Sequence, residues 1–214
     1  MSRRLTGLST IDRTRLPAEC GGCMFWQSAE ALPRQCGAAC DETAVDEWSR
    51  RVLNEWGEFG RAAVEDGEVL GFIKYAPPAY LPQIRHMPSG PPEDGAAIIA
   101  CMHIVPEARR RGLGGVLLRE AMRDLAQRGE RAAQAYATTA GDDYRGVPFI
   151  GVEFLLRNGF TVVRPHPDVP LLRVDLKSLV SWTENLEAVL ESLRLPMRVP
   201  KHAPATLSTR RGEQ

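Results

Sequence analysis

A nearly unbroken apolar run from Ala97 to Val105 (AIIACMHIV) constrains the fold of this chain most strongly. An apolar run of this length is typical of a strand buried on both faces of a sheet. Pro106 ends the run, and residues 113–128 then carry leucine and alanine at helical spacing, with charged residues off that stripe. We therefore expect a central strand that leads through a short junction into an amphipathic helix.

The residues before the central strand predict one helix, one hairpin and a long loop. Residues 42–57 carry apolar side chains at three- and four-residue spacing, which favours a helix. Asp66-Gly67 separates two strand-like runs, 61–65 and 68–75, and favours a type I′ turn because both residues tolerate positive φ. The proline-rich residues 76–95 predict an irregular loop that could contribute to a substrate site.

The chain is expected to divide into four parts. An N-terminal arm with a Cys-rich first-strand segment covers 1–41, and a core domain covers 42–178. Within the core, the pattern after the amphipathic helix predicts strands at 131–138, 160–164 and 171–176 and a short helix at 152–158. A capping-box pattern opens a C-terminal helix within 179–199 that packs on the core, and the polar residues 200–214 are expected to be disordered.

Charge and hydropathy exclude several classes of protein. Lys plus Arg and Asp plus Glu are both 27, so the net charge is near zero, whereas a nucleic-acid binder needs a basic surplus. We find no signal-peptide pattern and no apolar stretch near the roughly 20 residues of a membrane span. We therefore expect a cytoplasmic protein, monomeric or homodimeric, that binds neither nucleic acid nor membrane.

The junction between the central strand and its helix has the features of a phosphate site. Residues 109–114 read Arg-Arg-Arg-Gly-Leu-Gly and stand at the N-terminus of the helix, where free N–H groups and the helix dipole attract anions. Gly112 and Gly114 leave room for a phosphate to approach the backbone. The junction lacks the Gly-Lys-Ser/Thr ending of a P-loop, and it is not the dinucleotide fingerprint G-x-G-x-x-G.

This junction resembles the R/Q-x-x-G-x-G/A acetyl-CoA motif of the GNAT N-acetyltransferases. Ile104-Val105-Pro106 resembles the V-x-P strand end of that family, and residues 154–160 (FLLRNGF) resemble its second signature, F-Y-x-x-x-G-F. The resemblance covers residues 45–176. At the N-terminus, Cys20-x-x-Cys23 with the nearby Trp26 resembles a subgroup of the family.

The resemblance implies an α/β (α+β) GNAT fold, with a twisted, mixed but mainly antiparallel sheet flanked by helices and two splayed central parallel strands. It implies an enzyme that transfers an acetyl group from acetyl-CoA to a primary amine by direct attack in a ternary complex. The acceptor could be a protein lysine, a peptide N-terminus or a small amine. The implied cofactor-binding residues are Ile104, Val105, Arg109, Arg110, Arg111, Gly112, Leu113 and Gly114.

The residues that would move protons depart from the family pattern. Leu155 stands where the family often has its acidic tyrosine, and the central strand carries no glutamate. His103 is the titratable side chain on that strand that suits base chemistry near neutral pH, and a partly buried histidine without catalytic duty is the alternative. Tyr144 could replace the missing tyrosine, or it could be a plain surface aromatic. These departures leave a non-catalytic acyl-CoA-binding or sensor module as the rival hypothesis.

Four of the five cysteines fall within twenty-one residues near the N-terminus. Cys20, Cys23, Cys36 and Cys40 are spaced nearly as zinc ligands are, and a zinc-held module that recruits a partner is one interpretation. The other is small residues that pack around a first strand, and this is the favoured one. We therefore predict no metal ligands, with structural zinc as the alternative. Cys101 in the central strand is expected to be a small buried hydrophobe.

Overall fold

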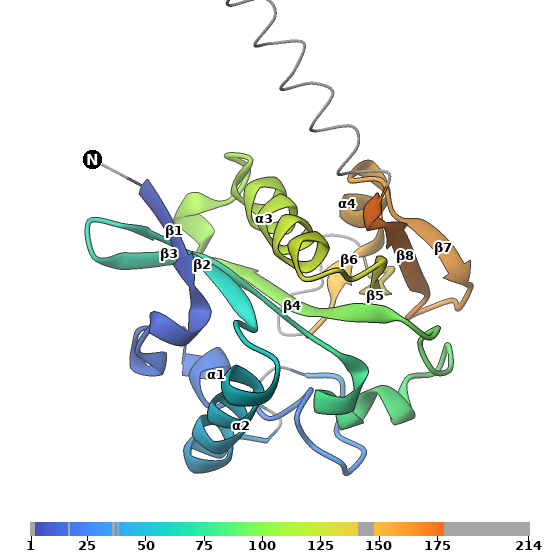
Figure 1. Ribbon diagram of the computed structural model, residues 1–214, viewed down its shortest axis with the longest axis horizontal. Coiled ribbons are helices and arrows are strands. Elements are labelled where there is room, and N and C mark those ends of the chain that lie inside the picture. The colour runs from blue at the N-terminus through green and yellow to red at the C-terminus, as the bar shows by residue number, and fades with distance from the viewer. Residues whose placement is uncertain (1–2, 17, 36, 38, 141–147, 178–214) are drawn as a thin grey trace, which may run out of the picture. The chain divides into compact units, whose positions relative to one another are not determined.

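The computed structural model describes residues 3–16, 18–35, 37, 39–140 and 148–177. These residues form an eight-stranded sheet (Figure 1) in which the strands are ordered β1-β2-β3-β4-β5-β8-β7, while β6 pairs with β5 beside this path. The central pair β4–β5 is parallel, as is β5–β6, and the other pairs are antiparallel. The strands are β1 (Arg3–Gly7), β2 (Gly60–Glu65), β3 (Glu68–Ala76), β4 (Ala96–Ile104), β5 (Ala132–Thr138), β6 (Ile150–Gly151), β7 (Thr161–Arg164) and β8 (Leu171–Asp175).

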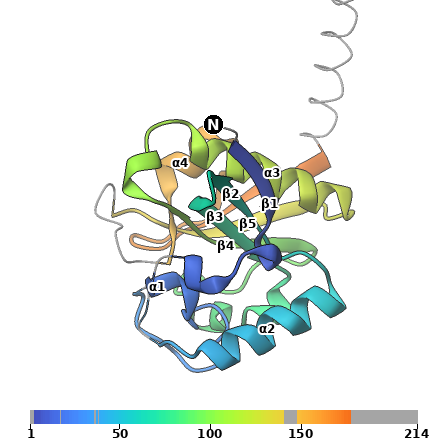
Figure 2. The ribbon, with the colours of Figure 1, turned by 90° about the vertical axis from the view of Figure 1, so that its left-hand side faces the viewer.

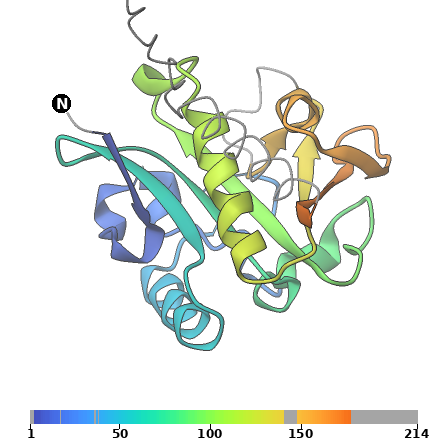
Figure 3. The same ribbon diagram turned by 45° about the horizontal axis from the view of Figure 1, so that its top comes forward.

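Helices cover both faces of this sheet. Figure 2 shows α3 (Leu113–Gln127) and α4 (Val152–Arg157) on one face and α1 (Ala18–Gly21) and α2 (Glu42–Glu55) on the other. Helix α3 lies across the middle of the sheet (Figure 3). Short 3-10 turns complete the connections, at Leu8–Thr10, Arg13–Arg15, Pro78–Tyr80, Pro82–His86 and Pro106–Ala108.

Two apolar clusters, one on each face, make up the core. The cluster under α3 joins the helix residues Leu117 and Leu125 to Ile99 of β4. The opposite cluster joins Trp48 of α2 to Phe72 of β3 and to aromatic residues of the N-terminal segment. Because β4 contributes to both clusters, it is buried on both faces, as its apolar sequence predicts.

The fold class expected from the sequence is confirmed, and the hairpin, α2, α3 and α4 form where their patterns predict them. In the hairpin, Asp66 and Gly67 have φ values of 48° and 90°, as a type I′ turn requires. Asp41 caps α2 by accepting a hydrogen bond from the Ala44 N–H at 3.0 Å. None of the helices within the described residues is both long and apolar enough to cross a membrane.

Two local predictions were wrong. The expected loose arm contains β1, which pairs with β2 along its whole length because backbone hydrogen bonds need no apolar pattern. The first strand expected in the Cys-rich segment, around Met24 to Trp26, does not form: residues 25–27 are a turn, and Cys23 and Cys40 form an isolated bridge there. The long loop at 76–95 is irregular apart from two 3-10 turns and the last residue of β3. The predicted C-terminal helix within 179–199 and the tail 200–214 lie outside the described residues.

Candidate active site

Strands β4 and β5 separate shortly after they begin. They pair only where Ala96–Ile98 faces Ala132–Gln134, although β4 continues to Ile104. On its other side β4 stays paired with β3, and the N–H of Val105 still donates to Leu70 O at 3.0 Å. The second half of β4 therefore has one free edge in the described part of the chain.

The groups on this free edge follow from the alternation of an antiparallel ladder. Since Val105 bonds to β3, so do His103 and Cys101, and the N–H and C=O groups of Met102 and Ile104 face away from β3. Ile104 O accepts a hydrogen bond from Arg109 Nε at 2.8 Å. The edge left open by β5 thus offers backbone donors to an extended ligand, which could add to β4 as another strand would.

The junction between β4 and α3 provides a second set of backbone N–H donors. Gly112 is the N-cap residue just before α3, with φ of 77° and no side-chain cap, and Arg110 also has a positive φ, of 58°. The first backbone hydrogen bond of the helix runs from Val116 N to Gly112 O at 3.2 Å. The N–H groups of residues 113–115 have no acceptor within the described residues, so they are available to an anion at the positive end of the helix dipole.

The two motif glycines, Gly112 and Gly114, are needed for different structural reasons. A Cβ on Gly112 would meet nothing within 4 Å, so the positive φ, and not a steric contact, favours glycine there. A Cβ on Gly114 would lie 3.2 Å from Ile104 Cδ1 and 3.3 Å from Phe154 Cε2. Gly114 therefore lets the start of α3 pack closely against β4 and α4, and this contact holds the junction beside the free edge.

The basic residues of the motif surround this junction. Arg109, Arg110 and Arg111 are exposed. Arg109 is fixed by its hydrogen bond to Ile104 O, whereas Arg110 and Arg111 form no ion pair with a described residue. The predicted cofactor-binding residues, from Ile104 to Gly114, are thus brought together at one end of β4, with positive charge beside free N–H groups.

His103 lies on the opposite face of β4 from α3. Its imidazole is half-buried and stacks on Phe72, with ring centroids 6.1 Å apart and planes at 19°. Burial lowers the pKa of His103 from its ordinary 6.5, and the positive charge of Arg109 lowers it further, while Glu19 has a smaller opposing effect. The imidazole is therefore neutral at neutral pH and can accept a proton.

Leu155 and Tyr144 are the two positions considered for a tyrosine that acts as general acid, and neither provides such a tyrosine within the described residues. Leu155 is completely buried in the cluster under α3. Tyr144 lies outside the described residues. Tyr75 and Tyr136 are buried and already donate, to Asp124 Oδ2 at 2.5 Å and to Gly90 O at 2.8 Å, and burial raises the pKa of both.

The cysteines near the N-terminus form no metal centre within the described residues. Cys23 and Cys40 are free thiols, and Cys36 lies outside the described part of the chain. No group of three or more His, Cys, Asp or Glu side chains among the described residues could hold a metal ion. Burial raises the pKa of Cys101 to about 11, so this thiol stays protonated at neutral pH.

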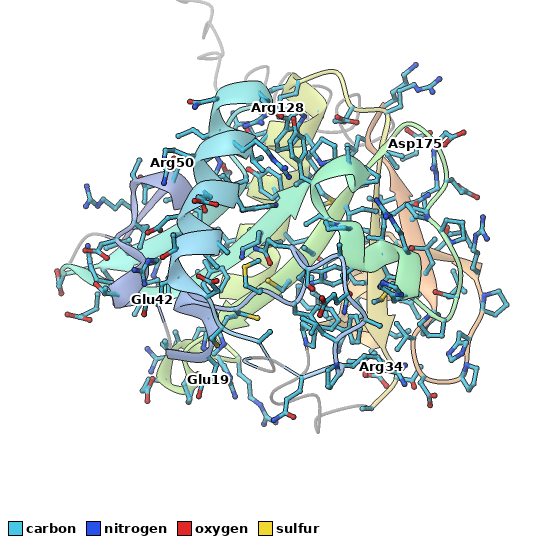
Figure 4. All side chains as sticks on the ribbon, turned by 90° about the horizontal axis from the view of Figure 1, so that it is seen from below. Glu19, Arg34, Glu42, Arg50, Arg128 and Asp175 are labelled. Carbon is cyan, nitrogen blue, oxygen red and sulfur yellow. The ribbon has the colours of Figure 1, made fainter. Side chains whose placement is uncertain are left out.

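Two further residues lie on the face of the sheet that α1 and α2 cover. Lys74 interrupts the apolar strand β3 and was not singled out from the sequence, whereas Trp26 follows the Cys-x-x-Cys pair noted above. Both side chains are more than nine-tenths buried. Figure 4 looks onto the face of the sheet that α1 and α2 cover, with Glu19 of α1 and Glu42 of α2 labelled.

Comparison with solved structures supports the fold. An N-acetyltransferase from Staphylococcus aureus Mu50 is 13% identical, with 82% of this chain and 99% of that chain covered and a TM-score of 0.55. An acetyltransferase of the GNAT family from Streptococcus pneumoniae is also 13% identical, with 81% and 99% covered and a TM-score of 0.55. The loading GNATL domain of CurA from Lyngbya majuscula is 15% identical, with 83% and 100% covered and a TM-score of 0.53.

Comparison at the level of sequence identifies the family. No curated protein matches the chain significantly. The model of the Acetyltransferase (GNAT) family matches residues 25–150, which is more than half of the chain and includes β4, the glycine junction and α3. The chain therefore belongs to the GNAT family of acetyltransferases.

Proposed function

We propose that this chain transfers an acetyl group from acetyl-CoA to an amine, within a ternary complex and without a covalent enzyme intermediate. The observation that carries the proposal is the position of the free edge of β4 beside the free N–H groups at the start of α3. One set of donors suits an extended amide-containing chain and the other suits a pyrophosphate. Coenzyme A contains both groups, joined end to end.

The binding roles follow from this arrangement. The N–H groups of residues 113–115 would bind the pyrophosphate, and Arg110 and Arg111 would add positive charge around it. Met102 and Ile104 would pair with the pantetheine amides along the free edge. An N–H group of the same edge would donate to the thioester oxygen, where negative charge develops as the amine attacks.

His103 would act as the general base. An alkylammonium has a pKa near 10.4, so a proton must leave the amine before or during attack. The amine nitrogen then forms its bond to the acetyl carbon, the carbon–sulfur bond breaks, and the proton passes to His103, directly or through water. The CoA thiolate departs with the electron pair. A thiolate is a tolerable leaving group, so the reaction can proceed without a tyrosine at Leu155.

Direct attack is favoured over an acyl-cysteine route. Cys101 is the cysteine of the strand β4, and an acyl-enzyme would need its thiolate as the nucleophile. Because burial raises the pKa of Cys101 to about 11, the thiolate is scarce at neutral pH. The acetyl group is therefore expected to pass straight to the acceptor.

A non-catalytic acyl-CoA-binding module is the second candidate. It is favoured by the buried Leu155 at the expected acid position and by the absence of a carboxylate from β4. Such a module would bind acetyl-CoA through the same junction and edge. It would not release CoA when an amine is added.

A thermal-shift titration followed by a turnover assay tests the proposal. Acetyl-CoA or CoA at 100 times its dissociation constant should stabilise the native protein by about 2.7 kcal/mol, and ATP at the same concentration should stabilise it less. Release of free CoA thiol in the presence of an amine panel, with the N-acetyl product confirmed by mass, would establish the enzyme. CoA binding without turnover on any amine would favour the sensor module, and no CoA binding would overturn both.

A further inference from the structure

Cys23 and Cys40 lie opposite each other in a short piece of antiparallel pairing near the N-terminus. The two residues form an isolated antiparallel bridge. On one side of the pair the Met24 N–H donates to Ala39 O at 2.9 Å, and the matching bond on the other side is 3.0 Å long. Because the flanking residues carry these hydrogen bonds, Cys23 and Cys40 are a non-hydrogen-bonded pair. Such pairs have Cα atoms about 4.5 Å apart and side chains that point to the same side.

This placement matches the geometry of a disulfide. Disulfides join residues whose Cα atoms lie about 4.4–6.8 Å apart and whose Cβ atoms approach each other. Gly22 gives an independent measure of the approach, since a Cβ built on it would lie only 3.6 Å from Cys40 Cβ. Cys40 Sγ donates a weak hydrogen bond to Gly37 O at 3.7 Å, and rotation about the Cα–Cβ bond releases it toward Cys23.

Cys101 of β4 is a rival partner for Cys23, but its chemistry is less suitable. Burial raises the pKa of Cys101 to about 11, Lys74 lowers it in part, and Cys23 adds to the rise. Thiol–disulfide exchange needs a thiolate, which is scarce at Cys101 near neutral pH. Cys40 is exposed, whereas Cys101 is only partly accessible. An oxidant in solution therefore reaches Cys40 more easily than Cys101.

We infer that Cys23 and Cys40 are a site of reversible oxidation, at which a low-molecular-weight disulfide cross-links the pair. The Cys40 thiolate attacks one sulfur of that disulfide, a mixed disulfide forms, and the first small thiol leaves. The Cys23 thiolate then attacks the Cys40 sulfur, the bond between the two protein sulfurs forms, and the second small thiol leaves. Two electrons and two protons pass from the protein pair to the small disulfide. Because exposed disulfides are easily reduced, an excess of a small dithiol reverses the reaction.

The cross-link would fasten the N-terminal segment to the start of α2. Cys40 lies directly before the N-cap residue of α2, and Cys23 lies just before the turn that carries Phe25 and Trp26 into the core. The rings of Phe25 and Trp26 both pack edge-on against Phe149, each at 5.8 Å. Closing a loop of about 18 residues restricts the unfolded chain. Oxidation should therefore stabilise the layer that covers this face of the sheet.

Non-reducing peptide mapping of the intact protein tests the inference. The reduced protein is incubated with oxidised glutathione at mildly alkaline pH, its remaining thiols are blocked with N-ethylmaleimide, and it is digested with trypsin. Trypsin leaves Cys23 on peptide 16–34 and Cys40 on peptide 35–50. We expect these two peptides to be joined, with maleimide on the remaining cysteine of each, and we expect dithiothreitol to separate them.

Substitutions and thermal unfolding assign the effect to the pair. Oxidation should raise the midpoint of thermal unfolding of the wild-type protein by about 5–10 °C. Cys23→Ser and Cys40→Ser should each lose both the joined peptides and this rise. Cys20→Ser, three residues before Cys23, is the matched control and should keep both.

Three results would overturn the inference. The first is separate peptides in the oxidised wild-type protein, with glutathione or maleimide on both Cys23 and Cys40. The second is maleimide on Cys23 or Cys40 within joined peptides, which would mean that a different pair of cysteines reacts. The third is one equivalent of zinc in the purified protein that protects both thiols from maleimide, since they would then be metal ligands. The map of the wild-type protein decides the question even if a variant does not fold, and none of these results bears on acetyl transfer.

Discussion

The two faces of β4 are built in different ways. On the α3 face, the candidate cofactor site consists mainly of backbone groups from one continuous stretch, residues 102–115. On the opposite face, the proposed acceptor site is built from side chains of separate segments, with His103 of β4 stacked on Phe72 of β3. A site made of local backbone suits a constant ligand such as coenzyme A. A site assembled from distant side chains can change its acceptor without disturbing the cofactor.

The largest expected effect tests the chemical role of the acceptor face, which is the face of β4 that carries His103. His103→Ala should lower kcat by about 100- to 10,000-fold, the range for loss of a general base, while the affinity for acetyl-CoA stays the same. Since the pKa of His103 is lowered, its base form persists to lower pH. The His103-dependent acidic limb of kcat should therefore fall below pH 6.5 and disappear in the variant. His86→Ala, at an exposed histidine, is the control. An unchanged pH–rate profile would remove His103 from the mechanism.

The second-largest expected effect tests the cofactor face, which is the α3 face of β4 with the start of α3. Gly112→Glu places a side chain at a positive φ and a negative charge among the N–H groups of α3, and should weaken acetyl-CoA binding by about 100-fold. Gly129→Glu makes the same change at the other end of α3, where φ is 83° and the space is equally open. Calorimetry should show loss of affinity in the first variant only. Equal losses in both would mean that strain, not the phosphate site, is responsible.

A third prediction concerns how α3 is held on its face of the sheet. Asp124 of α3 pairs with Arg61 of β2 and Arg128, both at 2.8 Å, and accepts a hydrogen bond from Tyr75. Asp124→Asn should lower the free energy of unfolding by about 2–3 kcal/mol, less than for a fully buried pair because both arginines are partly exposed. Denaturant unfolding measures this loss.

The matched control for that prediction is on the same helix. Glu120→Gln removes the exposed ion pair with Arg123, at 3.8 Å, and should change the free energy of unfolding by less than about 0.5 kcal/mol. A loss in Asp124→Asn no larger than that in Glu120→Gln would show that the buried network does not hold α3 in place.

The smallest expected effect tests the acceptor face again. The Tyr136 hydroxyl donates to Gly90 O at 2.8 Å and so fastens the proline-rich loop to β5. Tyr136→Phe should cost about 1 kcal/mol of unfolding free energy, the value of one hydrogen bond. It should alter acceptor KM more than acetyl-CoA affinity. Tyr80→Phe, which loses an exposed contact with Glu55, is the control and should change neither. A larger change in acetyl-CoA affinity would show that the two faces are coupled.

The same contrast explains what the sequence could predict. The hairpin, β4, the glycine junction and α3 depend on local propensity and periodicity, so their residues predict them well. β1 could not be predicted, because RRLTG has no strand pattern and is held by its pairing with β2. The side of the sheet on which His103 lies also depends on pairing with β3, since a register shift interrupts β4.

Hydrogen exchange with and without acetyl-CoA tests the central claim most directly, namely that the cofactor pairs with the free edge of β4 and the start of α3. Without ligand, the N–H groups of Met102, Ile104 and residues 113–115 should exchange fast relative to those of Cys101 and His103, which are bonded to β3. Acetyl-CoA should slow exchange of the N–H groups of Met102, Ile104 and residues 113–115. Exchange of the Cys101 and His103 N–H groups should stay nearly unchanged. Ligand protection elsewhere, with these N–H groups still exchanging freely, would contradict the account.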